Sequence, residues 1–393
     1  MKIVFVNQNM KMGGIAGSLY NALKLLDKQK EYEVDLVVFD PFFDEKFKDL
    51  TSLKIIVPFW LKFLFINKKD AWNHLPFWHF FLYFLFKSVA KIIGINSSRE
   101  WLIKRSRISE NYDIAISYSN DIPLKDVLTG SNDFVLHSVK AKQKIAWIHN
   151  DLDKLGFTRD YVLKRYAGFD KIVNVSEGCK KQLDTMAPEY IKRSYYVHNY
   201  IDADELEEKA IESIPFERKN EPVLVSVARI DNQQKRIDRI IETVRRLKNE
   251  AYNFQWYVVG SGKDLAALRA ESGKLGLDNQ LIFKGFQKNP YPFVKQADLF
   301  VLTSDYEAQP LAMMEALIIG TPVVTTDFPA AWEFIKPGEN GLIVEKSSEG
   351  IYQSLKQLLE DRNQLERIKQ NAGDHRLNLK NIYLNEIKNL FAG

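Results

Sequence analysis

The sequence predicts an α/β protein with two domains, each organised around a parallel β-sheet. A chain of 393 residues is too long for one hydrophobic core, whereas two domains of ordinary size account for its length. Short apolar runs typical of buried strands alternate with helical segments along most of the chain. Because this alternation produces parallel strands joined by right-handed crossovers, we expect two α/β halves.

The first half begins with a strand, a glycine loop and a helix. The strand is expected at 3–6, the loop at Gly13-Gly14 and the helix at 16–26. Further strands are expected at 34–39, 114–118, 144–148, 171–175 and 195–198. An insertion rich in aromatic and basic residues interrupts this pattern at about 54–107.

The second half follows a charged, proline-containing linker at 203–222. Its strands are expected at 223–227, 254–259, 281–284, 299–302 and 323–326, and its helices at 237–249, 264–275 and 291–296. A last helix is expected at 378–391. It carries an apolar stripe that must be buried, formed by Leu379, Ile382, Tyr383, Ile387, Leu390 and Phe391.

The most informative segment is 304–327, which places Glu307 and Glu315 eight positions apart around the start of a short helix. Pro310 suits the first helical turn, and Gly320 marks the helix end. Because a strand precedes the segment, Glu307 is expected beyond a strand's carboxyl end, where ligands bind in open α/β sheets. A carboxylate there accepts hydrogen bonds from a vicinal diol, so the pair suits a sugar and a ribose. A capped surface helix with solvated glutamates is the alternative.

This segment resembles the E-x7-E signature of the retaining nucleotide-sugar glycosyltransferases of family GT4, including its Glu-Ala…Gly-Thr-Pro-Val-Val continuation. The resemblance implies the GT-B fold, in which two Rossmann-like domains have parallel sheets facing a central cleft. It also implies an acceptor-binding domain over 1–200, a nucleotide-sugar-binding domain over 201–376, and a helix over 377–393 that crosses back to the N-terminal domain. Glu307 would then hold the transferred sugar, and Glu315 the ribose.

Other segments match the same family in the expected order. Arg229 and Lys235 stand where the family binds the donor diphosphate, although Ala228 and Arg236 replace glycines there. Two fixed cations neutralise the charge of a departing diphosphate, so we expect no metal. His149 stands where the family places a histidine beside the donor sugar, and a structural histidine is the alternative.

The resemblance further assigns donor-binding positions in loops that follow strands. These are Gly13, Gly14, Gly260, Gly262, Gly285 and Phe286, with Gln309, Pro310 and Leu311 beside the transferred sugar. The first glycine loop lacks the G-x-G-x-x-G spacing of a dinucleotide fingerprint, which argues against a nicotinamide enzyme.

We therefore expect a retaining glycosyltransferase that moves a hexosyl group from a nucleotide sugar, specifically a UDP-sugar. The expected acceptor is a glycan or a polyprenyl-diphosphate-linked sugar of surface polysaccharide or glycoconjugate synthesis. The donor is a co-substrate, and no cofactor is expected. A sugar-nucleotide epimerase or hydrolase of the same fold is one alternative, and a non-catalytic glycan- or nucleotide-binding protein is another.

The insertion combines positive charge with aromatic side chains. From Lys54 to Arg107 ten Lys or Arg stand against two acidic residues, a net charge of +8, and twelve aromatic residues lie between 59 and 86. Its longest uncharged apolar run, 75–86, is about half the ~20 residues that span a bilayer. Basic residues on both sides of short aromatic segments are typical of helices lying in the membrane interface. We expect the membrane and acceptor surface to include Trp60, Trp78, Phe81, Phe84, Lys87 and Lys91. An amphipathic helix pair packed on the domain is the alternative.

Composition and charge bear on the protein's partners and on its location in the cell. A net charge of only +4 gives no reason to expect a nucleic-acid partner. The single cysteine, Cys179, allows no intrachain disulfide, which is consistent with a reducing cytoplasm. The first apolar run is too short for a signal-peptide core. We expect a cytoplasmic protein, peripheral on the inner face of the cell membrane.

Overall fold

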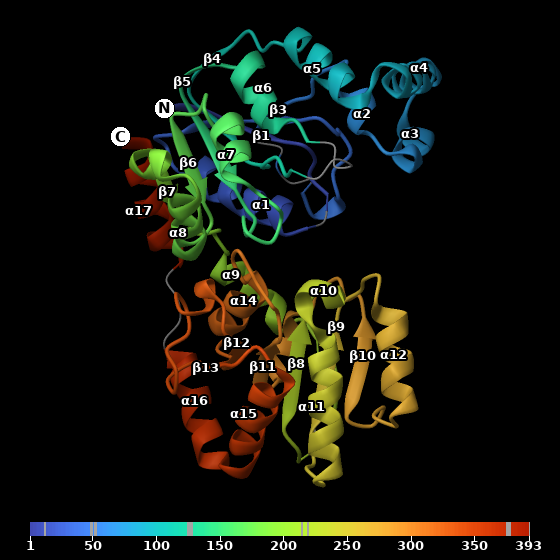
Figure 1. The fold of residues 1–393 in the computed structure, drawn as a ribbon, viewed down its shortest axis with the longest axis vertical. Coiled ribbons are helices and arrows are strands. Elements are labelled where there is room, and N and C mark those ends of the chain that lie inside the picture. Colours follow the sequence, from blue (N-terminus) through green and yellow to red (C-terminus); the bar gives the residue numbers. More distant parts are fainter. Residues whose placement is uncertain are drawn as a thin grey trace. The chain divides into compact units, whose positions relative to one another are not determined.

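The chain forms two compact α/β units (Figure 1). The structure, a computed structural model, describes residues 1–11, 13–47, 50, 53–123, 129–213, 215–217, 220–374 and 379–392. The N-terminal unit comprises Met1–Tyr200 and Asn385–Gly393, and the C-terminal unit comprises Ile201–Leu384. The domain boundary expected between residues 376 and 377 lies outside the described residues.

A seven-stranded parallel sheet organises the N-terminal unit, with the strand order β3-β2-β1-β4-β5-β6-β7. The strands are β1 (Lys2–Asn7), β2 (Glu33–Val38), β3 (Lys54–Ile56), β4 (Asn111–Ser117), β5 (Lys140–Ile148), β6 (Lys171–Asn174) and β7 (Ser194–Tyr196). The sheet grows in one direction from β1 to β3 and in the other from β4 to β7. Its topological switch point therefore lies between β1 and β4.

A six-stranded parallel sheet organises the C-terminal unit, with the order β10-β9-β8-β11-β12-β13. The strands are β8 (Val223–Val227), β9 (Gln255–Val259), β10 (Leu281–Gly285), β11 (Leu299–Leu302), β12 (Val323–Thr326) and β13 (Gly341–Val344). The switch point here lies between β8 and β11. Both units thus have the predicted doubly wound, Rossmann-like topology.

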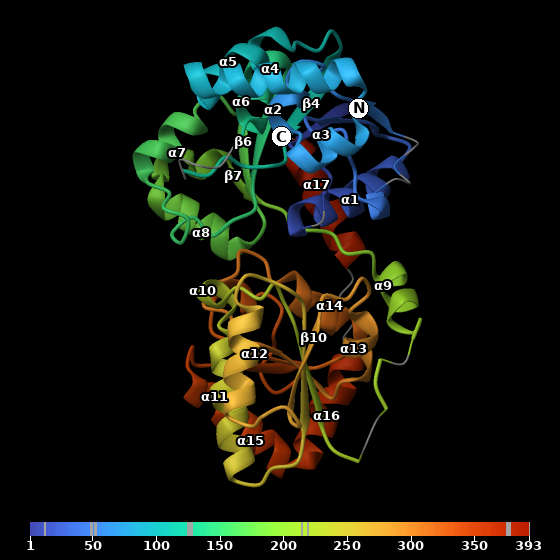
Figure 2. The same cartoon turned by 90° about the vertical axis from the view of Figure 1, so that its right-hand side faces the viewer.

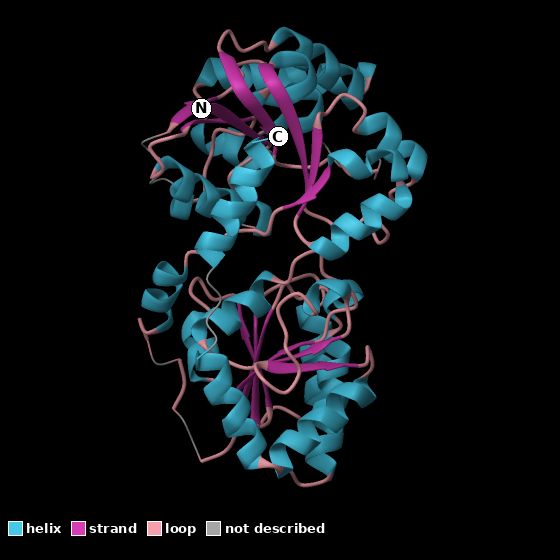
Figure 3. Ribbon diagram, turned by 90° about the vertical axis from the view of Figure 1, so that its left-hand side faces the viewer, coloured by secondary structure: helices cyan, strands magenta, loops and turns pink. Residues whose placement is uncertain are grey.

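Helices cover both faces of each sheet (Figure 3). In the C-terminal unit α11 and α12 lie on one face, whereas α13 and α14 lie on the other (Figure 2). The N-terminal unit contains α1 (Gly14–Asp27), α2 (Lys62–Phe65), α3 (Lys68–His74), α4 (Phe77–Ile93), α5 (Ile95–Arg105), α6 (Ser131–Ser138), α7 (Arg159–Arg165) and α8 (Glu177–Met186). The others are α9 (Ala203–Ala210), α10 (Asn232–Lys235), α11 (Ile237–Asn249), α12 (Leu265–Lys274), α13 (Tyr291–Gln296), α14 (Leu311–Ile319), α15 (Ser348–Glu360), α16 (Arg362–Asp374) and α17 (Leu379–Ala392). Short 3₁₀ turns occur at Glu45–Phe47, Pro188–Arg193 and Pro329–Ala331.

The predicted insertion folds as strand β3 and helices α2 to α5, and α2, α3 and α4 gather at one side of the N-terminal sheet (Figure 1). A small apolar core of its own contains Phe63, Ile66, Ala71 and Tyr83, with Phe80 and Phe86 packed against it. Part of the aromatic content is therefore interior. Phe65 packs against the main core of the unit, and most of the other aromatic side chains are exposed.

The last helix, α17, returns to the N-terminal unit as predicted. The amide N–H of His198 donates to Glu386 Oε2 at 2.9 Å, and the His198 ring contacts Glu386 Oε1 at 2.8 Å. Lys171 Nζ donates to the carbonyl oxygen of Leu390. The Phe391 ring meets Tyr32 edge to face at 5.8 Å. These contacts join α17 to β6, to the segment after β7 and to the segment before β2.

Truncating one buried residue of α17 should weaken the N-terminal unit. Leu390 is 1% exposed, so Leu390→Ala leaves a cavity and should lower the free energy of unfolding by about 2–5 kcal/mol. Ile382, on the same helix, is 40% exposed, and Ile382→Ala should cost well under half as much. Denaturant unfolding of both variants measures the difference. Equal losses would contradict the packing of α17 described above.

Candidate active site

The loops that follow β8 and β11 diverge at the switch point of the C-terminal sheet. The β8 loop runs through Arg229 into α10 and ends at Arg236, and the β11 loop runs from Thr303 to Pro310 before α14. In open α/β sheets, ligands bind beside the loops that diverge at such a point. Five of the residues predicted for the donor site lie on these two loops: Arg229, Lys235, Glu307, Gln309 and Pro310.

Lys235 and Glu307 form an ion pair between the two loops. Lys235 Nζ donates to Glu307 Oε1, and the two side chains are 17% and 8% exposed. The Ser304 hydroxyl donates to the same oxygen at 2.7 Å, and Gln234 Nε2 lies 3.5 Å from Glu307 Oε2. Removing either charge would strand the other in a largely water-free site, which is costly. The pair therefore fixes a cation and an anion side by side.

Arg229 lies beside this pair but remains open to solvent. Its guanidinium donates to Gln234 Oε1 at 3.1 Å and lies 3.8 Å from Asp231, and its side chain is 66% exposed. Gln234 thus links Arg229 with Glu307. The predicted trio of Arg229, Lys235 and Glu307 is brought together, with most guanidinium donors of Arg229 unused by these contacts. A forked cation of this kind suits phosphate oxygens.

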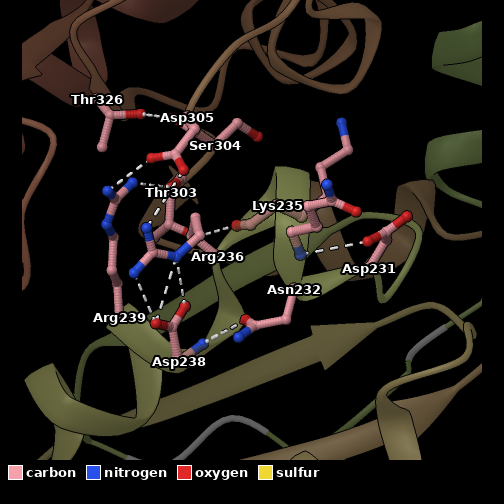
Figure 4. Close-up of polar contacts among 11 residues, drawn as sticks. Asp231, Asn232, Lys235, Arg236, Asp238, Arg239, Thr303, Ser304, Asp305 and Thr326 are labelled. Atoms are coloured by element: carbon pink, nitrogen blue, oxygen red, sulfur yellow. Dashed lines mark hydrogen bonds and ion pairs between the residues drawn. The ribbon is translucent and has the colours of Figure 1, made fainter. Parts of the chain in front are cut away.

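A second set of polar contacts holds the two loops against each other (Figure 4). The Thr303 hydroxyl donates to the carbonyl oxygen of Lys235 at 2.7 Å. Arg239, which is nearly buried, donates to the Thr303 carbonyl at 2.9 Å and pairs with Asp305 at 2.6 Å. Arg236 pairs with Asp305 at 3.2 Å and with Asp238 at 2.8 Å. The backbone carrying Lys235 is therefore held from both sides.

Gly260 and Gly262 support the Arg229 loop through close backbone packing. A Cβ atom at Gly260 would lie 1.9 Å from the Ala228 carbonyl oxygen, and one at Gly262 would lie 2.1 Å from the Ile230 carbonyl oxygen. Such distances exclude any side chain. These two predicted donor-binding glycines thus have a structural reason to be glycine, because they let the loop after β9 pack against the loop after β8.

Glu315 lies on α14 and accepts a hydrogen bond from the Tyr291 hydroxyl at 3.2 Å. Burial, followed by the neighbouring Glu315 carboxylate, raises the pKa of Tyr291, which therefore stays a hydrogen-bond donor. Gln309 is buried, and its Nε2 lies 3.3 Å from the Met314 sulfur. Glu307 and Glu315 thus have different partners, as expected for carboxylates with different roles.

The remaining donor-site predictions fall at the ends of structural elements. Pro310 directly precedes α14, whose first residue is Leu311, and Gly320 ends that helix in the left-handed conformation with φ 86°. Gly285 ends β10 with φ 70°, and the following Phe286 is 54% exposed. An exposed ring after a strand end is available to stack on a flat ligand.

His149, Gly13 and Gly14 belong to the N-terminal unit. Gly13 precedes α1, Gly14 is its first residue, and no atom lies within 4 Å of a Cβ built on Gly13. His149 is buried against the Tyr118 ring, with ring centroids 4.5 Å apart. Burial lowers the pKa of His149 to about 3, so its ring is neutral near pH 7. Among the described residues neither ring nitrogen has a hydrogen-bond partner.

The insertion surface agrees only in part with the predicted one. Trp78 is 74% exposed and Phe81 58%, Trp60 and Phe84 are also exposed, and so is Lys91. Lys87 is different, because its ammonium is half-buried and donates to the Leu64 carbonyl at 2.6 Å. Burial lowers the pKa of Lys87. This lysine ties α4 to α2 instead of belonging to the basic surface.

Several residues of the site were not predicted. Gln234 and Ser304 contact Glu307, and Tyr291 contacts Glu315. Asp305 pairs with both Arg236 and Arg239. Ser304 could have been found, because it lies three positions before Glu307 in the same loop. The others reach their partners across loops, which a sequence alone does not bring together. In the parts of the chain that the structure describes, no three His, Cys, Asp or Glu side chains gather as a metal site would need.

Known proteins match part of the chain in sequence. Residues 207–375 match the family model described as Glycosyl transferases group 1. Over 141 residues the chain is 31% identical to the lipopolysaccharide core biosynthesis glycosyltransferase LpsE of Rhizobium meliloti, covering 36% of this chain and 40% of that protein. Over 172 residues it is 30% identical to N-acetylgalactosamine-N,N'-diacetylbacillosaminyl-diphospho-undecaprenol 4-alpha-N-acetylgalactosaminyltransferase of Campylobacter jejuni, covering 43% and 45%. The chain thus spans less than half the length of these curated relatives.

Solved structures match the whole chain in fold. The Anabaena protein HepE, in complex with UDP and glucose, aligns with a TM-score of 0.71 and 16% identity, covering 100% of both chains. At this identity the likeness concerns the fold, which is GT-B. Residues 207–375 thus match the group 1 glycosyltransferases in sequence, and the chain has the GT-B fold over its length.

Proposed function

We propose that this protein is a retaining glycosyltransferase that moves a hexosyl group from a UDP-sugar to a glycan or lipid-linked acceptor. The observation that carries the proposal is the Lys235–Glu307 pair beside the exposed Arg229, at the switch point of the unit that matches the family. This arrangement sets cations for a diphosphate next to a carboxylate for sugar hydroxyls. The UDP named in the Anabaena structure supports uridine as the nucleoside.

Each side chain has a role that fits its surroundings. Arg229 and Lys235 neutralise the diphosphate as it departs with its negative charge. Glu307 accepts hydrogen bonds from hydroxyls of the transferred sugar, and Glu315, already paired with a tyrosine donor, accepts from the ribose. The buried His149 ring is neutral, with one N–H donor and one acceptor nitrogen, so a hydrogen bond from it would add no charge.

Retention follows when the acceptor approaches the face from which the diphosphate leaves. The acceptor oxygen forms its bond to the anomeric carbon as the bond from that carbon to the phosphate oxygen breaks. The acceptor proton passes to the leaving phosphate oxygen, so no protein nucleophile is required. The cations of the site stabilise this transition state, in which negative charge on the diphosphate is greatest.

The acceptor we propose is a sugar on a polyprenyl diphosphate or a growing glycan. The name of the Campylobacter relative includes a diphospho-undecaprenol acceptor, and that of the Rhizobium relative includes lipopolysaccharide core biosynthesis. A hydrolase or epimerase would consume the donor without any acceptor, and a binding protein would leave the donor intact. Following the fate of a UDP-sugar with and without acceptor separates these alternatives.

Loss of any charge of the trio should abolish most transfer while the fold persists. For Glu307→Gln, Arg229→Ala and Lys235→Ala we expect a barrier increase of ~2.7–4 kcal/mol each, or roughly a hundredfold to a thousandfold in rate. The control is Lys356→Ala, which removes an ion pair to Glu250 outside the switch-point loops and should leave transfer unchanged. Initial rates and melting temperatures measure both effects. Near-normal turnover in the three site variants would refute the assignment.

Transfer should not depend on a divalent cation, because Arg229 and Lys235 supply the charge that a metal would otherwise provide. We expect the same initial rate after dialysis against EDTA and after adding back Mg²⁺ or Mn²⁺. A rate that disappears with EDTA and returns with a metal would contradict this part of the proposal.

We further propose that α4 rests in the surface of an anionic membrane. Along this helix Phe77, Trp78, Phe81, Leu85 and Ile92 are all at least 47% exposed and follow one another at helical spacing. A continuous apolar face of this kind is uncommon on a soluble domain and indicates an interaction site. The same part of the unit contains exposed basic residues, namely Lys68, Lys69, Lys91, Lys104 and Arg105. A membrane with an apolar interior and anionic headgroups is complementary to both features.

Membrane contact would place the acceptor domain where lipid-linked sugars are found. In the described part of the chain, no helix has the length and apolar character to cross a bilayer. The 17 residues of α4 would therefore lie along the surface, with rings among the acyl chains and ammonium groups among the headgroups.

Liposome binding should require the exposed rings of α4. Vesicles with anionic lipid should sediment the protein, and salt should weaken binding without abolishing it, because only part of the free energy is electrostatic. The variant Trp78→Ser, Phe81→Ser, Phe84→Ser should remain folded and lose binding. Trp332→Ser changes a ring that is 58% exposed in the C-terminal unit and should bind normally. An unfolded triple variant, or a folded one that still binds, would contradict the membrane proposal.

A further inference from the structure

We propose that Arg236 is a positioning residue that holds Lys235 and Glu307 in register across the two switch-point loops. Its guanidinium ties the end of the β8 loop to Asp305 in the β11 loop. The inference rests on the proposed transfer reaction and extends it to a residue that stands where the resembled family has glycine.

The backbone of Arg236 is in a conformation that side chains rarely adopt. It has φ 51° and ψ 51°, left-handed, and it lies between the last residue of α10 and the first of α11. Among the described non-glycine residues only Ala251 also has a positive φ. Glycine adopts this conformation without steric cost, whereas a residue with a Cβ is strained. Strain of this kind persists only where surrounding contacts hold it.

Three donors of the Arg236 side chain supply such contacts. Arg236 Nε lies 3.0 Å from the carboxylate of Asp238, and Arg236 Nη2 lies 2.8 Å from it. Arg236 Nη1 lies 3.2 Å from Asp305 Oδ2 (Figure 4). The first two form a forked pair within the start of α11. The third crosses to the other loop, where the remaining oxygen of Asp305 accepts from Arg239 at 2.6 Å.

The positions of these contacts connect them to the reacting groups. Arg236 directly follows Lys235, and Asp305 comes two residues before Glu307. The amide of Asp305 donates to the Gln234 carbonyl at 2.9 Å, so the same two segments also meet through their backbones. Because Lys235 and Glu307 form a pair across this seam, a shift of either loop changes the distance between the diphosphate cation and the sugar carboxylate.

A simple contribution to stability is the competing explanation, and glycine distinguishes the two. Arg236→Gly removes the strain of the left-handed backbone, so it should leave the melting temperature unchanged or raise it. The same change removes the contact to Asp305. If Arg236 positions the pair, turnover should fall although the fold is no less stable, because small misplacements of catalytic groups are costly.

The experiment compares kcat, the donor KM and the melting temperature of four variants. For Arg236→Gly we expect kcat to fall about tenfold or more, with the donor KM changed less than threefold and no loss of melting temperature. Arg236→Lys should restore part of kcat, since an ammonium still reaches a carboxylate. Asp305→Asn should also lower kcat. In the double variant with Arg236→Gly, the fold-loss of kcat should be smaller than the product of the two single losses, because both changes remove the same contact between Arg236 and Asp305.

Arg245→Ala is the matched control. It removes an arginine–carboxylate pair, to Glu242 at 2.7 Å, from the exposed side of the same helix α11, and it should leave kcat unchanged. If Arg236→Gly fails to fold, Asp305→Asn, which leaves the strained backbone intact, decides by the same kcat criterion.

Three results would overturn the inference. One is kcat within twofold of the wild type in Arg236→Gly or in a folded Asp305→Asn. Another is full multiplication of the two single losses. The third is a wild-type protein that neither transfers sugar nor is stabilised by UDP, and this result would also refute the proposed function. An active wild type with unaffected variants refutes the positioning role alone.

Discussion

A lysine ammonium and a glutamate carboxylate meet where the loops after β8 and β11 leave the sheet, and both are largely shielded from water. Either charge would be costly there without the other, so the pair favours the arrangement in which the two loops stay together. The contacts around them serve that requirement. Ser304 and Gln234 bind the carboxylate, and Thr303 binds the backbone of the lysine. The site is thus prepared before a ligand arrives.

This preparation explains why the loop beyond β9 contains two glycines. The loop that contains Arg229 can pack closely against the loop after β9 only if no side chain lies between them. Gly260 and Gly262 have no side chain, so the carbonyl groups of Ala228 and Ile230 can approach them. The exposed guanidinium of Arg229 is thereby presented on a fixed backbone. A mobile arginine would lose more conformational entropy on binding a diphosphate than one whose main chain is already placed.

Sequence reasoning was most accurate where local signals were strong and mutually consistent. The bounds of β8, α11, α13, β11 and β12 are those predicted, because each is a clear apolar run or periodic segment between turn residues. The edge strands β3 and β13 were not predicted. They have only three and four residues, so their apolar runs are too short to distinguish a strand from a loop. The trio of the site was predicted from motif spacing, whereas Gln234, Tyr291 and Asp305 depend on tertiary contacts.

The insertion marks the limit of pattern reasoning. Helix α4 is apolar nearly all round, so periodicity could not separate Tyr83, which is buried, from Trp78, which is exposed. For the same reason Lys87 could not be distinguished from Lys91. Only the packing of α2 against α4 shows that one ammonium binds a carbonyl and the other points to solvent.

The path of α17 has a consequence for the order in which the protein is made. The ammonium of Lys171, the amide of His198 and the ring of Tyr32 all find partners between residues 386 and 391. On the ribosome these groups emerge long before their partners do. The surface of the N-terminal unit that α17 covers, around Lys171, His198 and Tyr32, therefore remains exposed until the second half of the chain has been translated. A chaperone that binds nascent chains would meet this patch during about half of the time of synthesis.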